Sequence, residues 1–367
     1  MPSHLFNPLQ LGPIELPNRI VVSPMCQYSA EDGSATDWHI QHLGSLGFSG
    51  AGLVMVEATG VERRGRITHG CLGLYSDDNE AALSHVIAVA RRTAGPARFG
   101  IQLAHAGRKA SARLPWADHP GPLAAGEDPW PTIAPSVLPF AEGWPTPQAL
   151  DETGLQTVLA AFVAAAQRAA RIGFDVVELH SAHGYLLHEF LSPLANRRID
   201  RYGGSLENRM RFPLMIARAL REVLPAGIAL GARITGSDWV EGAWTVADAA
   251  AFAGELRKLG AAYVCVSSGG AVAKAIIPTG PGYQVALAAE VKAKSGIATR
   301  AVGMITDFDQ AEEIIATGKA DMVALARGFL DDPRWGWHAA DRLGATVHCP
   351  PQYRRARPPA WNPARRA

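Results

Sequence analysis

One short run of the sequence, His180-Ser181-Ala182-His183-Gly184-Tyr185, contains side chains that can polarise a substrate and move a proton. Two neutral imidazoles side by side can donate hydrogen bonds to a carbonyl or anionic oxygen without placing a full charge beside it. Tyr185, two residues beyond His183, is a candidate proton donor. The run therefore predicts a site that stabilises a substrate oxygen and donates a proton close to it.

The same two histidines, three residues apart, could bind one metal ion if they lay on a helix. The residues from Val176 to Leu179 instead predict a strand, and no HExxH pattern supplies further ligands. A metal site is therefore disfavoured. A zinc-dependent barrel hydrolase built on His105, His180 and His183 is the alternative from a different class of enzyme, and it predicts a colourless protein that contains zinc.

A second run, Ser23-Pro24-Met25-Cys26-Gln27-Tyr28, ends a predicted strand. Cys26 lacks an obvious paired base for acyl chemistry, so a nucleophilic hydrolase is less convincing than a thiol that tunes a cofactor. An inert buried thiol is the other interpretation of an isolated cysteine.

A third set combines Arg233, Gly303 and the pair Arg327-Gly328, all at the ends of predicted strands. An arginine together with glycine-flanked backbone N–H groups provides what a bound phosphate requires. The alternative is a glycine that only permits a turn and an arginine that pairs with a surface carboxylate.

Eight short runs rich in Val, Ile, Leu and Ala are expected to be the strands that position these residues. None alternates polar and apolar residues, so the strands are expected to be buried on both faces, as in a parallel sheet covered by helices. The expected strands cover residues 18–25, 51–59, 97–105, 174–182, 228–235, 261–268, 297–305 and 320–327. The expected helices between them cover residues 80–93, 151–172, 206–224, 245–259, 284–295 and 307–317.

Eight strand–helix units predict an α/β fold, a (β/α)8 TIM barrel, as a single domain over residues 1–367. In such a barrel the active site lies at the carboxyl ends of the strands. Gln102 and residues 105–109, which end the third strand, are therefore also expected at the mouth of the barrel.

The segment from residue 113 to 147 interrupts this pattern. It holds nine of the 26 prolines together with Trp116, Trp130 and Trp144, so it cannot form one regular helix or strand. Because it follows the third strand, it is expected to lie over the barrel mouth as a lid or cover. A rigid surface excursion is the alternative.

The composition, with 48% apolar and 19% charged residues, is that of a globular protein. The 35 basic and 34 acidic residues nearly cancel, so no overall field favours nucleic acid or an anionic membrane as partner. No signal peptide or membrane span is evident, and the four cysteines form no CxxC pair. We therefore expect a cytoplasmic protein without an iron–sulfur cluster.

The first two runs, and a third motif from Asn196 through Asp200 and Tyr202-Gly203-Gly204-Ser205 to Phe212, resemble the Old Yellow Enzyme family. The resemblance extends over essentially the whole chain. Within the family, the chain resembles the thermophilic-like branch of ene-reductases that contains YqjM and xenobiotic reductase A. The larger dienoyl-CoA reductase type is the nearest alternative, but its added iron–sulfur cluster and nucleotide-binding region do not fit 367 residues with four dispersed cysteines.

The resemblance implies an ene-reductase, or NADPH dehydrogenase, that holds FMN noncovalently and uses NADPH as reductant. It implies ping-pong hydride transfer through flavin N5 to the activated C=C bond of an α,β-unsaturated carbonyl compound, with nitro compounds as further acceptors. The shared pocket explains why no strand is followed by GxGxxG, since NAD(P)H needs no separate binding domain. A noncatalytic binding role is the least expected function.

The resemblance also assigns residues to the flavin. Gln102 would hydrogen-bond the pyrimidine ring and Arg233 would lie near N1 and O2. Gly60 stands where relatives usually have alanine, which implies a backbone contact and a slightly larger pocket. The full set of implied flavin contacts, the last three of them at the phosphate, is Ser23, Pro24, Met25, Cys26, Gly60, Gln102, Arg233, Gly303, Ala326 and Arg327.

For the reaction itself, the resemblance implies that His180 and His183 bind the carbonyl oxygen of the substrate and that Tyr185 protonates its α-carbon. Cys26 would tune the redox properties of the flavin, and Tyr28 would face the substrate.

The C-terminal run Gln352-Tyr353-Arg354-Arg355 resembles the tail by which this branch inserts an arginine into a neighbouring subunit's site. The spacing after Gln-Tyr assigns this role to Arg355. Residues 345–367 are therefore expected at an interface of a homodimer or homotetramer. The alternative is a solvated basic tail, to which Arg354, Arg357, Arg365 and Arg366 would belong.

Overall fold

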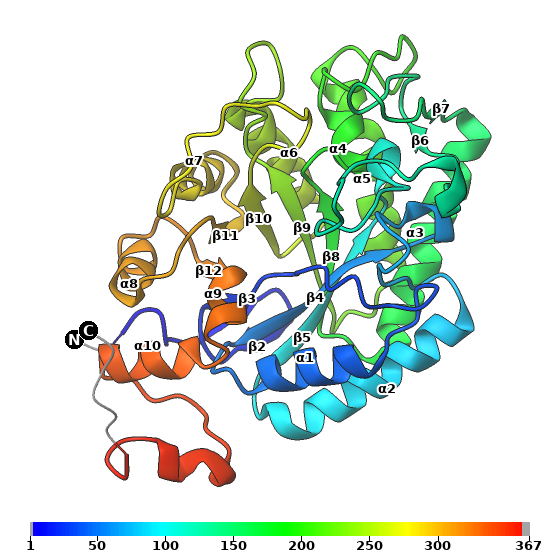
Figure 1. Ribbon diagram of the computed structural model, residues 1–367. Coiled ribbons are helices and arrows are strands. Elements are labelled where there is room, and N and C mark those ends of the chain that lie inside the picture. The colour runs from blue at the N-terminus through cyan, green and yellow to red at the C-terminus, as the bar shows by residue number, and fades with distance from the viewer. Residues whose placement is uncertain (1–2, 362–367) are drawn as a thin grey trace.

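In the computed structural model, which describes residues 3–361, eight parallel strands form a closed barrel (Figure 1). Each strand overlaps one of the eight predicted runs, so the predicted (β/α)8 TIM barrel is confirmed. The strands are shorter than predicted, and the first ends at Val22, so Ser23, Pro24 and Met25 lie just beyond it. Pairing of the last strand with the first closes the sheet, with Leu325 opposite Val22. The strands are β3 (Ile20–Val22), β4 (Leu53–Gly60), β5 (Arg98–Ala104), β8 (Val176–Ser181), β9 (Ala229–Thr235), β10 (Tyr263–Ser267), β11 (Ala298–Val302) and β12 (Met322–Leu325).

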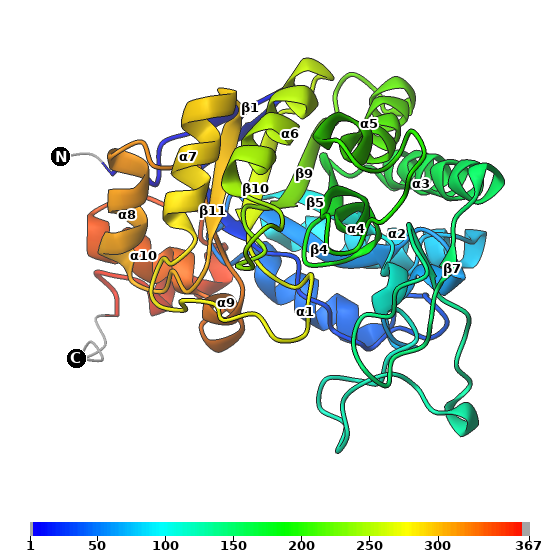
Figure 2. The same cartoon turned by 90° about the horizontal axis from the view of Figure 1, so that it is seen from above.

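Helices surround the barrel as an outer ring (Figure 2). The six predicted helices are confirmed, and side chains at their N-termini explain several of the boundaries. Asp151, for example, accepts a hydrogen bond from the Gly154 N–H. These helices are α2 (Asp77–Ala94), α3 (Glu152–Ile172), α5 (Leu206–Val223), α6 (Val246–Lys258), α7 (Val285–Ser295) and α8 (Phe308–Ala316).

The sequence analysis did not predict four further helices. The longer two, α1 (Asp37–Gly47) and α10 (Trp335–Leu343), contain glycine and clustered aromatic residues that obscure a helical pattern. The shorter two, α4 (Leu186–Leu191) and α9 (Arg327–Asp331), each span fewer than two turns. Both short helices directly follow barrel strands at the mouth of the barrel.

An N-terminal hairpin, β1 (Leu9–Leu11) and β2 (Ile14–Leu16), also went unpredicted. Its residues Leu11, Ile14 and Leu16 join the apolar cluster that fills the lower interior of the barrel. The turn residue Gly12 lies against Ala229 and Ala262, at the starts of β9 and β10. The hairpin therefore covers the end of the barrel opposite the mouth.

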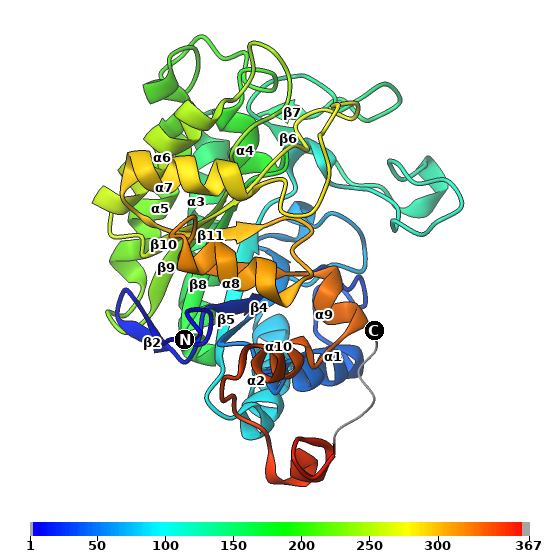
Figure 3. The same ribbon diagram turned by 90° about the vertical axis from the view of Figure 1, so that its left-hand side faces the viewer.

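The segment from residue 113 to 147 is irregular, as predicted, and projects from the barrel in Figure 3. It contains a single 3-10 turn, η3 (Ala125–Glu127), and a two-residue strand, β6 (Ile133–Ala134), which pairs with β7 (Gln148–Ala149). The ring of Trp116 lies edge-on to Tyr28, 5.5 Å between centroids. We call residues 113–147 the cover segment, because this contact brings it to the carboxyl end of the first barrel strand.

Within residues 3–361, none of the helices combines the length and the apolar composition needed to cross a membrane.

The hairpin yields a test of stability. Leu16 is completely buried, so Leu16→Ala should lower the free energy of unfolding by about 2–5 kcal/mol in a urea titration. Glu15, its exposed neighbour in the same strand, is the control. Glu15→Ala should change the stability by less than about 0.5 kcal/mol. Equal unfolding midpoints for the two variants would show that the hairpin is not part of the cooperative core.

Candidate active site

The turn after β8 brings His180, His183 and Tyr185 together at the mouth of the barrel. The centroids of His180 and His183 are 5.2 Å apart, and those of His180 and Tyr185 are 4.9 Å apart. Both contacts are edge-on. The turn is possible because His183 and Gly184 adopt left-handed backbone angles, with φ of 60° and 70°. The reactive groups foreseen in the sequence therefore lie in one cluster.

Hydrogen bonds from neighbouring elements hold this turn. The His183 N–H donates to Thr235 Oγ1 at 3.0 Å, and the Gly184 N–H donates to His188 Nδ1 at 2.9 Å. Lys109 Nζ donates to the carbonyl oxygens of His183, at 2.8 Å, and Gly270, at 3.1 Å. A left-handed residue such as His183 costs conformational energy, and these contacts offset that cost.

Lys109 is a site residue whose role the sequence did not reveal. Its ammonium lies 4.8 Å from the ring centroids of both Tyr185 and Phe140. Burial lowers the pKa of Lys109 to about 8. One side chain thereby links the end of β5, the turn after β8, the loop after β10 and the cover segment.

The two histidines are held as neutral rings. Burial, followed by the charge of Arg233, lowers the pKa of both His180 and His183 well below the ordinary 6.5. The Ala182 N–H donates to His180 Nδ1 at 3.3 Å, so the proton of this ring is on Nε2. His183 Nε2 shares a 2.7 Å hydrogen bond with Ser267 Oγ, which leaves Nδ1 for other partners.

Tyr185 and Cys26 are likewise neutral. Burial raises the pKa of the Tyr185 phenol well above 10, so the hydroxyl keeps its proton. Burial, reinforced by the nearby Glu57 carboxylate, raises the pKa of the Cys26 thiol well above 9. A thiol in this environment is a poor nucleophile.

Glu57 supports the end of the first strand from below. Its Oε2 accepts a hydrogen bond from the Gln27 N–H at 3.2 Å, and its Oε1 lies 3.4 Å from His39 Nε2. Tyr28, next along the chain, has a left-handed φ of 52°. This arrangement carries Cys26 and Tyr28 to the mouth, while Ser23 and Pro24 lie buried below them.

The polar groups that remain without partners fit a flat, partly anionic cofactor such as FMN. Arg233 lies beside His180 in the β8–β9 pairing, and its Nε is buried without a hydrogen-bond partner in the described chain. Ser23 Oγ is also buried without a hydrogen-bond partner in the described chain. An uncompensated cation and unpaired donors are costly unless a ligand with acceptors meets them.

At the end of the barrel where the phosphate is expected, two strands end earlier than predicted, and the seventh, β11, ends at Val302, just before Gly303. The eighth strand, β12, ends at Leu325, and Arg327 is the first residue of α9 rather than the last residue of a strand. Arg327 is exposed, and no carboxylate of residues 3–361 pairs with it. Gly303 has φ of 121°, and a Cβ there would lie 2.6 Å from Gln284 Nε2. The glycine therefore permits the close approach of Gln284, while the exposed guanidinium of Arg327 is the kind of cation that a bound phosphate requires.

Gly60 lines a small cavity of about 10 Å³ together with Cys71, Ala104 and Tyr185. A Cβ at Gly60 would meet Arg66 Cγ at 3.2 Å, so an alanine here requires a shift of a few tenths of an ångström. The position of the missing methyl group is therefore taken up by the Arg66 side chain and is not left as free volume beside Tyr185.

His105 is not grouped with the two histidines of the turn. Its Nε2 pairs with Glu62 at 2.9 Å and its Nδ1 accepts from the Gly107 N–H, so both nitrogens are engaged. No three His, Cys, Asp or Glu side chains in the described part of the chain are placed to hold one metal ion. The geometry thus gives the zinc alternative no support.

Arg355 lies apart from the other predicted site residues, in the 3-10 helix η4 (Pro351–Ala356) beneath α10 in Figure 1. Tyr353 fixes this helix, since its ring packs 5.4 Å from Phe48 and 5.7 Å from Trp337. Arg355 is exposed and makes no hydrogen bond within the described residues. Arg365 and Arg366 lie outside the described residues.

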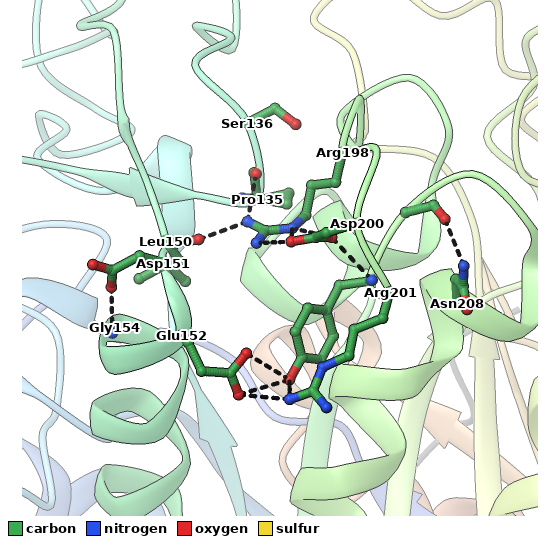
Figure 4. Close-up of polar contacts among 12 residues, drawn as sticks. Pro135, Ser136, Leu150, Asp151, Glu152, Gly154, Arg198, Asp200, Arg201 and Asn208 are labelled. Carbon is green, nitrogen blue, oxygen red and sulfur yellow. Dashed lines mark hydrogen bonds and ion pairs between the residues drawn. The ribbon is translucent and has the colours of Figure 1, made fainter.

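The third motif contributes structure at the rim of the mouth (Figure 4). Arg198 pairs with Asp200 at 2.5 Å and donates to the carbonyl oxygens of Pro135, at 3.0 Å, and Leu150, at 2.6 Å. These contacts fasten the end of the cover segment to the loop before α5. A hollow of about 430 Å³ lies beside them, lined by residues 135–138 and 197–200.

The chain is similar to known flavin enzymes over nearly its full length. Residues 4–344 match the model of the NADH:flavin oxidoreductase / NADH oxidase family. NADPH dehydrogenase of Geobacillus thermodenitrificans is 42% identical over 353 residues, which cover 96% of this chain and 98% of the relative. NADPH dehydrogenase of Listeria innocua is 42% identical over 356 residues, covering 96% and 99%. The solved structure of morphinone reductase superposes with a TM-score of 0.76 at 30% identity, covering 95% and 92%.

The neutral histidines yield a prediction about pH. With their pKa values well below 6.5, the ring signals of His180 and His183 in NMR spectra should not titrate between about pH 5.5 and pH 7. The unfolded chain binds protons in this range that the folded rings do not, so these two groups should make stability fall as pH falls through 6.5.

Arg233→Leu is the matched variant for this measurement. Removing the cation should raise the pKa of both rings, although burial still holds it below the ordinary value. Ring signals that titrate near pH 6.5 in the unsubstituted protein would contradict the assignment of neutral imidazoles.

Proposed function

Since the chain belongs to the NADH:flavin oxidoreductase / NADH oxidase family, the family of Old Yellow Enzyme, we propose that it reduces the activated C=C bond of α,β-unsaturated carbonyl compounds. The chain is an oxidoreductase with FMN as cofactor and NADPH as reductant. Nitro compounds are a second class of acceptor with the same need for an oxygen-binding site. The single observation that carries the proposal is the cluster of His180, His183 and Tyr185 with neutral rings.

Bound FMN supplies the capacity to accept a hydride from NADPH and to deliver one to an acceptor. The chain would hold it through Arg233, Gln102 and Ser23 around the ring system, and through the backbone near Gly303 and Arg327 at the phosphate. Arg233 would supply positive charge beside the ring system, because no carboxylate of the described residues pairs with it.

The two histidines would bind the carbonyl oxygen of the substrate. His180 Nε2 carries a proton and makes no hydrogen bond to the described chain, so it can donate to that oxygen. During reduction of the β-carbon, negative charge develops on the carbonyl oxygen. Preorganised neutral hydrogen-bond donors stabilise this charged oxygen more than they stabilise the uncharged oxygen of the starting substrate. His183, three residues further along the turn, would bind the same carbonyl oxygen.

Tyr185 would deliver the proton that completes reduction at the α-carbon. Its hydroxyl is protonated because burial raises its pKa, and it donates to no other group of the described residues. Tyr28 and Trp116 would form the opposite wall of the substrate site. Cys26, a neutral thiol beside the first strand end, would adjust the electronic properties of the flavin without reacting with the substrate.

An anaerobic experiment tests the proposed function. The purified protein should be yellow, lose its flavin absorption when NADPH is added, and regain it on addition of cyclohexenone or maleimide. Tyr185→Phe should slow the second step by about 10²–10⁴-fold, the usual contribution of a positioned acid, and leave the first nearly unchanged. Tyr75→Phe, which alters a tyrosine bonded to Asp32, is the control.

Two results would contradict the proposal, and a third would contradict the single pocket that the family resemblance implies. A colourless protein that contains zinc would favour the hydrolase, and a flavin signal that no activated alkene restores would exclude alkene reduction. Steady-state lines that converge, rather than run parallel, would contradict the use of one pocket by both substrates.

For Arg355 we propose that it completes the site of a neighbouring subunit in a homodimer or homotetramer. Support comes from its exposure and from the packing of Tyr353, which holds η4 away from the mouth of its own barrel. Arg355→Ala should raise the KM for the alkene about tenfold, as expected for the loss of one charge-assisted hydrogen bond. Arg354→Ala, its exposed neighbour, should have no such effect. Equal KM values for both variants would favour a solvated basic tail.

A further inference from the structure

Directly below the proposed flavin site, the barrel interior contains four buried polar side chains, Gln102, Glu178, Tyr263 and Arg300. We call this set the interior network. Glu178, Tyr263 and Arg300 are completely buried, and Gln102 is 1% exposed. They come from four strands, β5, β8, β10 and β11, and their polar atoms meet at the Glu178 carboxylate. A buried charge pair is expensive, so a specific arrangement of this kind requires full compensation.

Each carboxylate oxygen of Glu178 has assigned partners. Oε1 accepts a hydrogen bond from Gln102 Nε2 at 2.8 Å. Oε2 accepts from the Tyr263 hydroxyl at 2.6 Å and from Arg300 Nη2 at 2.5 Å. Because Arg300 compensates the charge of Glu178, the network adds no net charge beneath the flavin. Arg233 remains the cation of the site.

The backbone leaves space for this arrangement. Tyr263 on β10 reaches Glu178 on β8 across the intervening strand β9, where the residue in register with both is Gly231. A Cβ at Gly231 would lie 2.2 Å from the Tyr263 ring. The glycine therefore permits contact between side chains of strands that are not neighbours.

These hydrogen bonds determine the orientation of the Gln102 side-chain amide. The two ends of a glutamine side chain look alike in shape, and only hydrogen-bond partners determine which end points where. A carboxylate can only accept hydrogen bonds, so Gln102 must turn its NH₂ group toward Glu178. Its Oε1 receives no hydrogen bond from the described chain and is left as an acceptor.

We propose that Glu178, whose charge Arg300 compensates, is a positioning residue that fixes the Gln102 carbonyl as an acceptor for the imide N3–H of the flavin pyrimidine ring. The site would thereby select a ring system with a donor at that edge. This inference rests on the proposed function in one respect, the contact between Gln102 and the pyrimidine ring. It does not depend on which acceptor the enzyme reduces.

A competition between two flavins tests the inference without measuring turnover. Holoenzyme is equilibrated with equal excesses of FMN and 3-methyl-FMN, freed of unbound flavin by gel filtration, and its bound flavins are quantified. The unsubstituted protein should prefer FMN by about tenfold or more, because methylation removes the donor and leaves a buried acceptor unpaired.

Glu178→Gln should reduce this preference several-fold, because a neutral amide can donate as well as accept and the Gln102 side chain can then turn over. Glu178→Gln paired with Arg300→Met tests the same point without an uncompensated buried cation, should the single variant fail to fold. Tyr263→Phe is the matched control. It removes a hydrogen bond from the same carboxylate without touching Gln102, so it should lower the melting temperature and keep the full preference for FMN.

The outcomes are distinguishable. If Glu178→Gln and the double variant keep the preference of the unsubstituted protein, the network has only a structural role and the inference is wrong. If Tyr263→Phe loses the preference as Glu178→Gln does, general loosening of the barrel explains the result and the inference is also wrong. If the unsubstituted protein shows no preference, the contact between Gln102 and the pyrimidine ring is wrong, and with it the inference.

Discussion

The pairing of β12 with β3 is the interaction on which the site depends, because it closes the sheet. In a closed parallel barrel every strand ends at the same rim, so side chains far apart in the sequence must meet there. Ser23, His180 and Arg327 are carried to this rim by the first, fourth and eighth strands of the barrel. Without closure, the first and last of these would lie on opposite edges of an open sheet, and one ligand could not contact both.

The fold was predictable from the sequence because the signal is local and repeated. Each strand is a short apolar run, and each helix of the outer ring begins or ends at a recognisable residue. The N-terminal hairpin escaped because three-residue strands carry little pattern. The glycines within α1 hid another element, since a helix stabilised by tertiary packing does not need a strong propensity of its own.

The site was predictable in part for the same reason. His180, His183 and Tyr185 lie within six residues of one another, so their proximity follows from the sequence. The contacts of Lys109 and Arg198 are different, because each bridges segments that only the folded chain brings together. The interior network was also hidden. Glu178 and Arg300 are charged residues inside apolar runs, and nothing in either run shows that strands β8 and β11 direct them to the same point.

Arg198 has a further consequence for how this enzyme can change. It anchors the cover segment at Pro135 and the chain just beyond it at Leu150, while Thr235, Ser267 and His188 hold the turn after β8. The proposed substrate wall at Trp116 and the turn from His180 to Tyr185 therefore have separate sets of hydrogen bonds, and Lys109, which bonds His183 and lies beside Phe140, joins the two. Substitution of cover-segment residues other than Pro135 and Phe140 can therefore alter which molecules fit, while the turn from His180 to Tyr185 keeps its hydrogen bonds.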